Sequence, residues 1–564
     1  MGVMRLSVPA GMVLALVVLG CAAPRAGREA EALVPAPESR CATRADGSAE
    51  LLAAHLYARQ SVAPSPAAAE DQDEEGVAIL NDQGDLVIRR NPFDLEGSGL
   101  RFVPNGSGGY DLLPVSLAPG PPGTSLNVPT GGAASVDLPF SFPFFDRNWD
   151  RVFVQSDGSL AFGAADVGAG EPGLARFLGG PPRVAAFFTS LDPSRAGSVA
   201  GRLEASRATF QWAGVPGSGQ INRNTFQVAL EPSGAVEIVF GSEMQSREAV
   251  VGLSPGGTRE VAAADLSGSR PSGTTGAIAE RFSESEKADL VMIARRFFAS
   301  HPDRFEQLVV YTTRPINPLP GSLAFEVNVR NEVEGIGLEL FDHTAEWSSA
   351  GALASVAYMD SIDQYLEVDG FEILAHEVGH RWLARLRFRR GTEGPSGALL
   401  GRAGVHWSFF LDTDASVLEG NRIADRGNGR FETVDITRGY SALDQYVMGL
   451  RLPAEVPPFF YVDEADNFRP NRAFKFSSAP EAGISFTGVR REVTIGDVVA
   501  ALGPRVPDAT RAPRLLRQAF LLVADATAPA TPARRQALAR IRARFGPYYR
   551  EATGGRATAD STLP

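Results

Sequence analysis

The spacing of apolar residues divides the chain into a β-rich part and a later part in which helices and strands alternate. Residues 77–80 and 86–89 are β-prone runs on either side of a Gly-containing turn cluster, which predicts a hairpin. Between residues 136 and 254 short runs of this kind recur between Gly, Pro and Asp turns. Such spacing is typical of an antiparallel sandwich or barrel, so a β-rich region is expected over residues 77–275.

The spacing of apolar residues along the chain changes beyond residue 280. Residues 285–300 have the i, i+3, i+4 spacing of a helix, and strand-like runs follow at residues 308–312 and 325–329. This alternation indicates an α/β unit over residues 280–455, followed by a mixed C-terminal subdomain over residues 456–564. Two amphipathic helices are expected in that subdomain, at residues 515–524 and 533–545.

The first 20 residues have the order of a secretory signal peptide. Arg5 supplies a positive charge before an apolar run over residues 6–20, and small residues follow. The run of about 15 apolar residues is too short to span a bilayer. Residues 21–76 are rich in Ala, Pro and Glu and offer few large apolar side chains, so a disordered tether is expected.

The end of this signal, Val18-Leu19-Gly20-Cys21, resembles the lipobox of bacterial lipoproteins. The resemblance implies that Cys21 is acylated and anchors the exported chain in the cell envelope, at the outer membrane or the cell surface. The alternative is an ordinary signal peptide with a chance cysteine. The chain has two cysteines, so a lipidated Cys21 would leave Cys41 without a partner for a disulfide.

Charge and histidine content narrow the possible functions of the 564-residue chain. Its net charge of −12 argues against a nucleic-acid partner, because phosphate binding requires clustered Lys and Arg. Histidine occurs only six times, and three of these residues fall between positions 376 and 406. This clustering is the first indication of chemistry in the chain.

Two of these histidines form the motif His376-Glu377-Val378-Gly379-His380, inside a helix predicted over residues 369–388. Side chains at i and i+4 project from one helix face and can reach one Zn²⁺ ion. Glu377 lies beside the first histidine and can reach a metal-bound water without ligating the metal. The alternative is a pair of hydrogen-bonded histidines on a helix face with an incidental glutamate.

A catalytic zinc ion normally takes three protein ligands and leaves one position for water. The residues after the motif lack the glycine-then-histidine continuation of metzincins, so the third ligand must come from farther along the chain. His406, Glu419 and Asp444 are the candidates. His406 could also be a core histidine, and Asp444 a charge on a helix surface.

Residues 371–450 resemble the zinc-dependent metallopeptidases of the HExxH clan, in particular those whose third ligand is an acidic residue on a following helix. The resemblance implies Asp444 as the first choice of ligand, with His406 and Glu419 as alternatives. It also implies a fold class that is multidomain α+β, with the β-sandwich region followed by a zincin-like α/β metallopeptidase domain and C-terminal helices. The implied substrate is a protein or peptide, cleaved as by an endopeptidase rather than an exopeptidase.

If zinc is bound, its chemistry indicates roles for other residues. Glu377 would take a proton from the attacking water and deliver it to the leaving amine. Tyr440, Tyr446 or an unligated His406 would stabilise the oxyanion. Carboxylates in expected loops, at Asp412, Asp414 and residues 425–432, could bind a structural Ca²⁺ ion, although Asx turns are the favoured explanation.

Three stretches within residues 130–257 resemble the nidogen-like extracellular module; they are residues 139–145, 154–162 and 224–228. The resemblance implies a binding or spacing role without chemistry of its own. Two function classes therefore follow from the sequence. One is a membrane-tethered zinc metallopeptidase with a β accessory domain, and the other is a surface adhesion lipoprotein whose zinc site is degenerate or structural.

Overall fold

The fold is described from a computed structural model of the chain. The described residues are 41–44, 70–115, 118–166, 172–258, 261–268, 271–316, 322–392, 394–466, 474–525 and 527–564. Cys21, the expected signal peptide and most of the expected tether lie outside these residues. The described chain is a multi-sheet, β-rich fold with few helices, which confirms the coarser part of the expected fold class.

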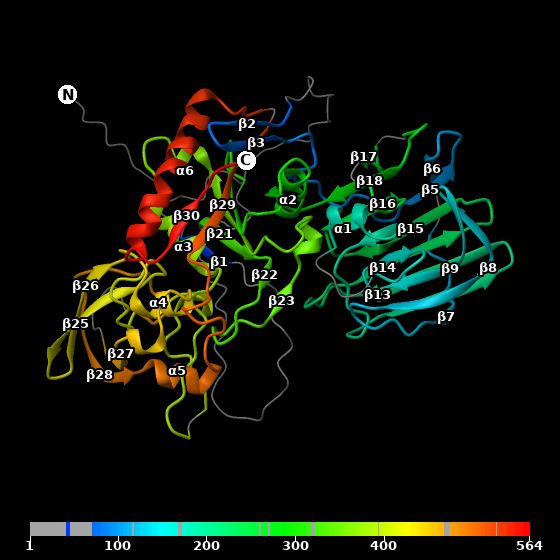
Figure 1. The fold of residues 1–564 in the computed structure, drawn as a ribbon. Coiled ribbons are helices and arrows are strands. Elements are labelled where there is room, and N and C mark those ends of the chain that lie inside the picture. The colour runs from blue at the N-terminus through cyan, green and yellow to red at the C-terminus, as the bar shows by residue number, and fades with distance from the viewer. Residues whose placement is uncertain are drawn as a thin grey trace, which may run out of the picture. The chain divides into compact units, whose positions relative to one another are not determined.

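Two seven-stranded sheets form a β-sandwich in the first half of the chain (Figure 1). The first has the order β6-β5-β15-β14-β13-β12-β7 (Tyr110–Val115, Gly99–Pro104, Val236–Met244, Asn224–Leu230, Arg207–Val215, Ser198–Glu204, Thr124–Ser125). The second has the order β17-β18-β16-β11-β10-β9-β8 (Val261–Ala263, Ala277–Phe282, Ala249–Ser254, Arg183–Phe188, Ser159–Ala161, Arg147–Gln155, Ala133–Phe144). All printed pairings within these sheets are antiparallel except β17 with β18.

The sandwich has one aromatic-rich core between its two sheets. Trp212 on β13 stacks on Phe226 of β14 at 5.0 Å between ring centroids. Phe162 and Phe187 from the side of the second sheet belong to the same buried cluster. Because residues of both sheets share this cluster, the expected antiparallel sandwich is confirmed.

The second half of the chain is organised around a mixed eight-stranded sheet. Its order is β1-β21-β24-β20-β29-β3-β2, with β30 beside β29 (Cys41–Arg44, Ser322–Asn328, Ser355–Ser361, Gln307–Thr312, Leu515–Ala524, Val77–Asn81, Gln72–Glu74, Thr558–Asp560). Strands β24, β20, β29 and β3 are parallel, and β21 lies antiparallel to β24. The expected strands at residues 308–312 and 325–329 are thus confirmed.

Helices cover both faces of this sheet. On β20, Val309 and Tyr311 belong to the buried cluster that contains helices α3 (Phe371–His380) and α6 (Pro532–Ala552). The alternate residues of β20, Leu308 and Val310, belong to another cluster, which contains α2 (Leu290–Phe298). Successive side chains of a strand point to opposite faces, so α3 and α6 lie on one face and α2 on the other.

Two predictions about the strands of this sheet were wrong. Residues 515–524, expected as a helix, form β29, which is buried on both faces. A strand that is buried on both faces carries apolar side chains at consecutive positions. Such a run lacks the alternation of apolar and polar residues by which a half-exposed strand is recognised. The expected hairpin at residues 77–89 does not form: β3 pairs with β29 and β2, and β4 (Val87–Ile88) pairs with β19 (Lys287–Ala288).

The remaining elements are short. A four-stranded sheet has the order β25-β26-β28-β27 (Asn421–Gly427, Arg430–Ile436, Ser485–Val493, Phe459–Asp466). The other helices and 3₁₀ turns are α1 (Leu174–Gly179), α4 (Ala442–Val447), α5 (Ile495–Leu502), η1 (Thr344–Trp347), η2 (Ile362–Tyr365), η3 (Arg402–Gly404) and η4 (Pro453–Glu455), and one strand pair is β22 (Arg330–Asn331) with β23 (Phe341–Asp342). Among the helices that the structure describes, none has the length and apolar character needed to cross a bilayer.

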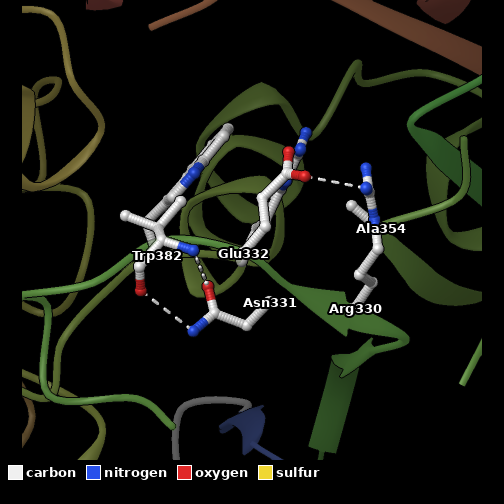
Figure 2. Close-up of a pocket in the computed structure, with 7 residues that line it drawn as sticks. Arg330, Asn331, Glu332, Ala354 and Trp382 are labelled. Carbon is white, nitrogen blue, oxygen red and sulfur yellow. Dashed lines mark hydrogen bonds and ion pairs between the residues drawn. The ribbon is translucent and has the colours of Figure 1, made fainter. Parts of the chain in front are cut away.

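A small pocket lies where β22 meets the residues after α3 (Figure 2). Its lining includes Arg330, Asn331, Glu332 and Trp382, and no histidine. Arg330 donates to Glu332 at 2.8 Å, and the Asn331 amide bonds to the backbone of Val333. The Asn331 amide thus holds the local backbone, and Arg330 and Glu332 pair with each other.

Helix α6 fixes the start of α3. Arg540 and Arg544 both form ion pairs with Asp369, which lies just before α3, and the Arg540 Nε atom is 3.0 Å from the carboxylate. Phe371, the first residue of α3, packs on Tyr548 with 5.1 Å between ring centroids. The packing of α6 on the sheet thus helps to set the position of α3.

We expect Leu538→Ala in α6 to destabilise this region by about 2–5 kcal/mol, because Leu538 is completely buried and its truncation leaves a cavity. Hydrogen exchange should show faster opening of α6, α3 and β29. Gln536→Ala is the matched control, since Gln536 is exposed on the same helix and its truncation should change stability by less than about 0.5 kcal/mol. Equal exchange rates in the two variants would contradict a positioning role for α6.

Candidate metal centre

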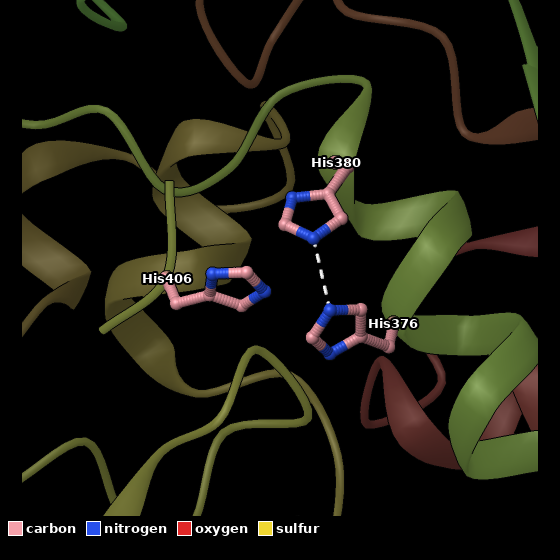
Figure 3. Close-up of side chains that lie close together, drawn as sticks. All are labelled: His376, His380 and His406. Atoms are coloured by element: carbon pink, nitrogen blue, oxygen red, sulfur yellow. Dashed lines mark hydrogen bonds between the residues drawn. The ribbon is translucent and has the colours of Figure 1, made fainter. Parts of the chain in front are cut away.

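Helix α3 brings the two histidines of the motif together. Leu374 and Val378 face the core of the sheet, which fixes the rotation of the helix. The Nε2 atoms of His376 and His380 lie 2.9 Å apart (Figure 3). The i, i+4 arrangement is thus present in the structure, but the helix is shorter than predicted, since α3 ends at His380 and residues 381–388 are not helical.

The third histidine, His406, comes from the loop that follows η3. Its ring centroid is 5.1 Å from that of His376 and 5.0 Å from that of His380. One ring nitrogen of each of the three residues lies within 4.8 Å of the others, and all three residues are buried. The group can therefore hold a metal ion.

Backbone carbonyls orient all three imidazoles. The Nδ1 atom of His376 is 2.7 Å from the Val417 oxygen, and that of His380 is 3.1 Å from the Leu383 oxygen. The Nδ1 atom of His406 is 2.9 Å from the Arg402 oxygen. A carbonyl oxygen only accepts, so each Nδ1 must donate, and each Nε2 carries a lone pair that is able to ligate a metal.

The geometry and ionisation of the three histidines fit a metal ion. Two lone pairs that face each other at 2.9 Å repel unless a cation or proton lies between them, and tetrahedral Zn–N bonds would separate the two nitrogens by about 3.3 Å. Burial lowers the pKa of His376 and lowers those of His380 and His406 well below the ordinary value. All three therefore favour the neutral form that ligates metals.

Glu377 lies on α3 directly after His376 and is fully buried. Burial raises the pKa of the nearby Tyr365, and the charge of the Glu377 carboxylate raises it further. Glu377 is not one of the grouped metal donors. This placement agrees with its predicted role beside the metal rather than on it.

The preference for Asp444 as the third ligand is not what the geometry favours. Asp444 lies in the first turn of α4, where its carboxylate accepts from the Ser441 backbone N–H at 2.7 Å. Its other oxygen accepts from the indole N–H of Trp407 at 2.8 Å. The Asp444 carboxylate thus caps α4 and binds Trp407. His406, the residue before Trp407, lies beside the two motif histidines.

Glu419 forms an ion pair with Arg402 at the edge of the histidine group. The Arg402 Nε atom is 3.1 and 3.2 Å from the two carboxylate oxygens of Glu419. The Arg402 Nη2 atom also bonds to Glu419 and lies 2.9 Å from the Nε2 atom of His406. Arg402 was absent from the predicted site, because a single arginine in a loop carries no periodic or motif signal.

The two tyrosines proposed for the oxyanion are engaged elsewhere. The Tyr440 hydroxyl donates to the Ala375 oxygen at 2.6 Å, and the Tyr446 hydroxyl accepts from the Arg505 backbone N–H at 3.2 Å. Both side chains are buried in the main core cluster. Their hydroxyl groups support α3 and α4, and the structure gives them no role at the histidine group.

The expected calcium loops form no metal-donor group in the described residues. Asp412 accepts from the Asp414 backbone N–H at 3.4 Å and from the Ile423 N–H at 3.0 Å, and Asp425 accepts from the Gly427 N–H at 2.9 Å. Within the described ranges, the three histidines form the only set of three or more candidate donors. The carboxylates of Asp412 and Asp425 thus stabilise turns, as the Asx-turn alternative expected.

Comparisons with known proteins bear on the sandwich alone. A family model described as NIDO related matches residues 116–289, which confirms the nidogen-like resemblance. The match ends before α3 and leaves the histidine group outside it. No curated protein and no solved structure matches the chain.

A buried carboxyl group lies below the end of α3. Burial raises the pKa of Glu326 on β21 to about 8, while the charges of Arg385 and Arg381 oppose this shift. The Asn328 amide donates to Glu326 at 3.0 Å and to the His380 oxygen at 3.3 Å. The folded chain thus keeps this carboxyl protonated at neutral pH, close to the end of the motif.

We expect His406→Ala to weaken metal binding by about 100-fold or more, because it removes one of three ligands. Asp444→Asn keeps the shape of the capping side chain and should weaken binding by less than about 10-fold. Chelator competition with Zn²⁺ and metal analysis of the purified proteins would measure both. The opposite order of the two variants would restore Asp444 as the ligand.

We expect Glu326→Gln to change how stability depends on pH. The folded pKa of about 8 lies above the ordinary value of 4.5, so wild type loses stability as pH rises between these values. The loss is about 1.4 kcal/mol per pH unit, or on the order of 4 kcal/mol from pH 5 to pH 8. The variant should lack this loss in hydrogen exchange of β21, and Glu284→Gln controls for removal of one exposed carboxylate. Parallel pH profiles of wild type and Glu326→Gln would contradict the assignment.

Proposed function

We propose that the chain is a zinc-dependent peptidase that hydrolyses peptide bonds at the cell envelope. One observation carries this proposal: three buried Nε2 lone pairs converge beside the glutamate of the same helix. A purely structural histidine cluster has no need of three lone pairs that face one another. A metal ion gives this arrangement a physical reason.

His376, His380 and His406 are the residues that would hold the metal. Three neutral imidazole nitrogens within 4.8 Å of one another suit Zn²⁺, and three protein ligands are typical of catalytic rather than structural zinc. When bound, zinc would lower the pKa of a water molecule and polarise the carbonyl group of the substrate. The three carbonyl acceptors keep each ring in the tautomer that this role requires.

Glu377 is the proton carrier in this proposal. As the oxygen of water bonds to the carbonyl carbon, Glu377 accepts the proton that water loses, and the carbonyl π electrons move to oxygen. The carbon–nitrogen bond then breaks, and Glu377 delivers the proton to the leaving amine. Its buried position on α3, one residue after His376, supports this assignment.

The proposal extends to a zincin-like unit and to an envelope location. Helix α3 packs on a mixed sheet whose strand β21 is antiparallel to β24, and this helix-on-sheet packing is consistent with an α/β peptidase unit. The nidogen-like sandwich supplies a binding or spacing module, and a lipid on Cys21 would anchor the chain in the membrane. Within this proposal the substrate is an extended protein segment, cut internally.

We expect Glu377→Gln to retain stoichiometric zinc and to lower peptide hydrolysis by about 10²–10⁴-fold, because the proton carrier is lost while the ligands remain. A peptide library digested by wild type and variant and followed by mass spectrometry would measure this. Glu372→Gln is the matched control, since Glu372 is exposed on the same helix.

The outcomes separate the two function classes. Zinc-loaded wild type that cleaves no library peptide would favour the adhesion lipoprotein with a structural metal site. Wild type without stoichiometric metal would overturn the proposal at its first step.

A further inference from the structure

The clearest unassigned feature beside the histidine group is the Arg402–Glu419 pair. The Arg402 side chain is 18 % exposed and the Glu419 side chain 10 %. Two Arg402 nitrogens, Nε and Nη2, face the Glu419 carboxylate. A planar guanidinium held along one edge by a carboxylate has a fixed orientation.

The orientation brings an N–H group to the histidine group. An arginine Nη2 atom carries two hydrogens, and the Arg402 Nη2 atom bonds to Glu419 and lies 2.9 Å from the Nε2 atom of His406. The Arg402 N–H group that faces His406 thus donates to the Nε2 lone pair with which His406 would bind a metal. A metal that takes this lone pair would leave the N–H group without His406 as its acceptor, and the group would then face an oxygen atom that a substrate places beside the metal.

The pair fits next to a cation because its charges cancel. An isolated guanidinium would repel a divalent ion across a short, poorly solvated distance. Glu419 neutralises that charge, because its carboxylate forms an ion pair with the guanidinium. The site therefore gains a strong hydrogen-bond donor without a net positive charge.

The same two segments also orient the ligands. The Arg402 carbonyl accepts from His406, and the Val417 carbonyl, two residues before Glu419, accepts from His376. The position of the guanidinium is thus coupled to two of the three imidazoles. A donor placed in this way is preorganised before substrate arrives.

We infer that Arg402, held by Glu419, is a catalytic residue that binds the carbonyl oxygen of the scissile bond and stabilises the charge that develops on it. This inference rests on the proposed peptidase function and fills the role that Tyr440 and Tyr446 do not take. When water adds to the carbonyl carbon, the π electron pair moves to this oxygen, and the Arg402 N–H group donates to it. The electron pair returns to the carbon as the carbon–nitrogen bond breaks.

The test uses full-length protein loaded with Co²⁺, whose visible spectrum reports what binds to the metal. Inorganic phosphate is the oxyanion probe, and imidazole is a neutral probe that needs no donor from the protein. We expect Arg402→Gln to keep its Co²⁺ affinity and its affinity for imidazole, and to bind phosphate at least 10-fold more weakly. For any peptide that wild type cleaves, kcat should fall by about 10²–10³-fold.

Two further variants keep the test decisive if Arg402→Gln fails to fold. Arg402→Lys keeps the charge but loses the planar fork, and Glu419→Gln loses the anchor of the guanidinium; each should weaken phosphate binding by at least 3-fold. Arg426→Gln is the matched control, since Arg426 pairs with Glu432 on the exposed β25–β26 hairpin. Its probe affinities should equal those of wild type.

The failures of the two proposals are distinguishable. If Co²⁺ does not bind, or if Glu377→Gln leaves hydrolysis unchanged, the peptidase proposal fails. If Co²⁺ binds and hydrolysis needs Glu377, but the Arg402 variants match wild type in kcat and phosphate affinity, only the role of Arg402 is overturned.

Discussion

The centre of the molecule depends on hydrogen bonds from three imidazole Nδ1 atoms to the backbone carbonyls of Leu383, Arg402 and Val417. A buried imidazole N–H without an acceptor would destabilise the fold by about 1–3 kcal/mol. Each ring is therefore buried at a place where a backbone carbonyl can accept its hydrogen bond. These carbonyls belong to three separate segments: the turn after α3, the turn η3 and the segment before β25. The three Nε2 lone pairs converge only if the sheet and α6 hold these three segments at fixed positions relative to α3.

The local part of this site could be predicted from sequence, and the non-local part could not. His376 and His380 lie one turn apart on any helix, so their approach follows from spacing alone. The position of His406 depends on a loop that no periodicity describes. The resemblance to metallopeptidases with an acidic third ligand favours Asp444, yet a carboxylate in the first turn of a helix accepts hydrogen bonds from the backbone N–H groups there. The role of Arg402 could not be predicted from the sequence, because its orientation depends on the ion pair with Glu419, 17 residues later in the chain.

The same distinction explains the errors in the fold. The sandwich strands show a clear local pattern, and several pairs, such as β8 with β9 and β13 with β14, are neighbours in the chain. Strand β3 instead pairs with β29, whose residues lie more than 400 positions later, and no local pattern records such a partner. Strand β29 was misread as a helix because helices cover it on both sides, which removes the polar alternation of a half-exposed strand.

The sandwich and the mixed sheet are also joined more closely than their sequence patterns indicate. Phe177 of α1 and Phe188 of β11 share one buried cluster with Ile293 and Phe297 of α2, and Arg295 donates to the backbone oxygen of Ala175 at 2.8 Å. A flexible linker between independent domains would be exposed and polar, with few contacts across it. Here α2 covers one face of the mixed sheet and contacts the sandwich at the same time. Cutting the chain between the two would uncover apolar surface on both sides, so the nidogen-like module acts as a fixed part of the unit that carries the histidine group.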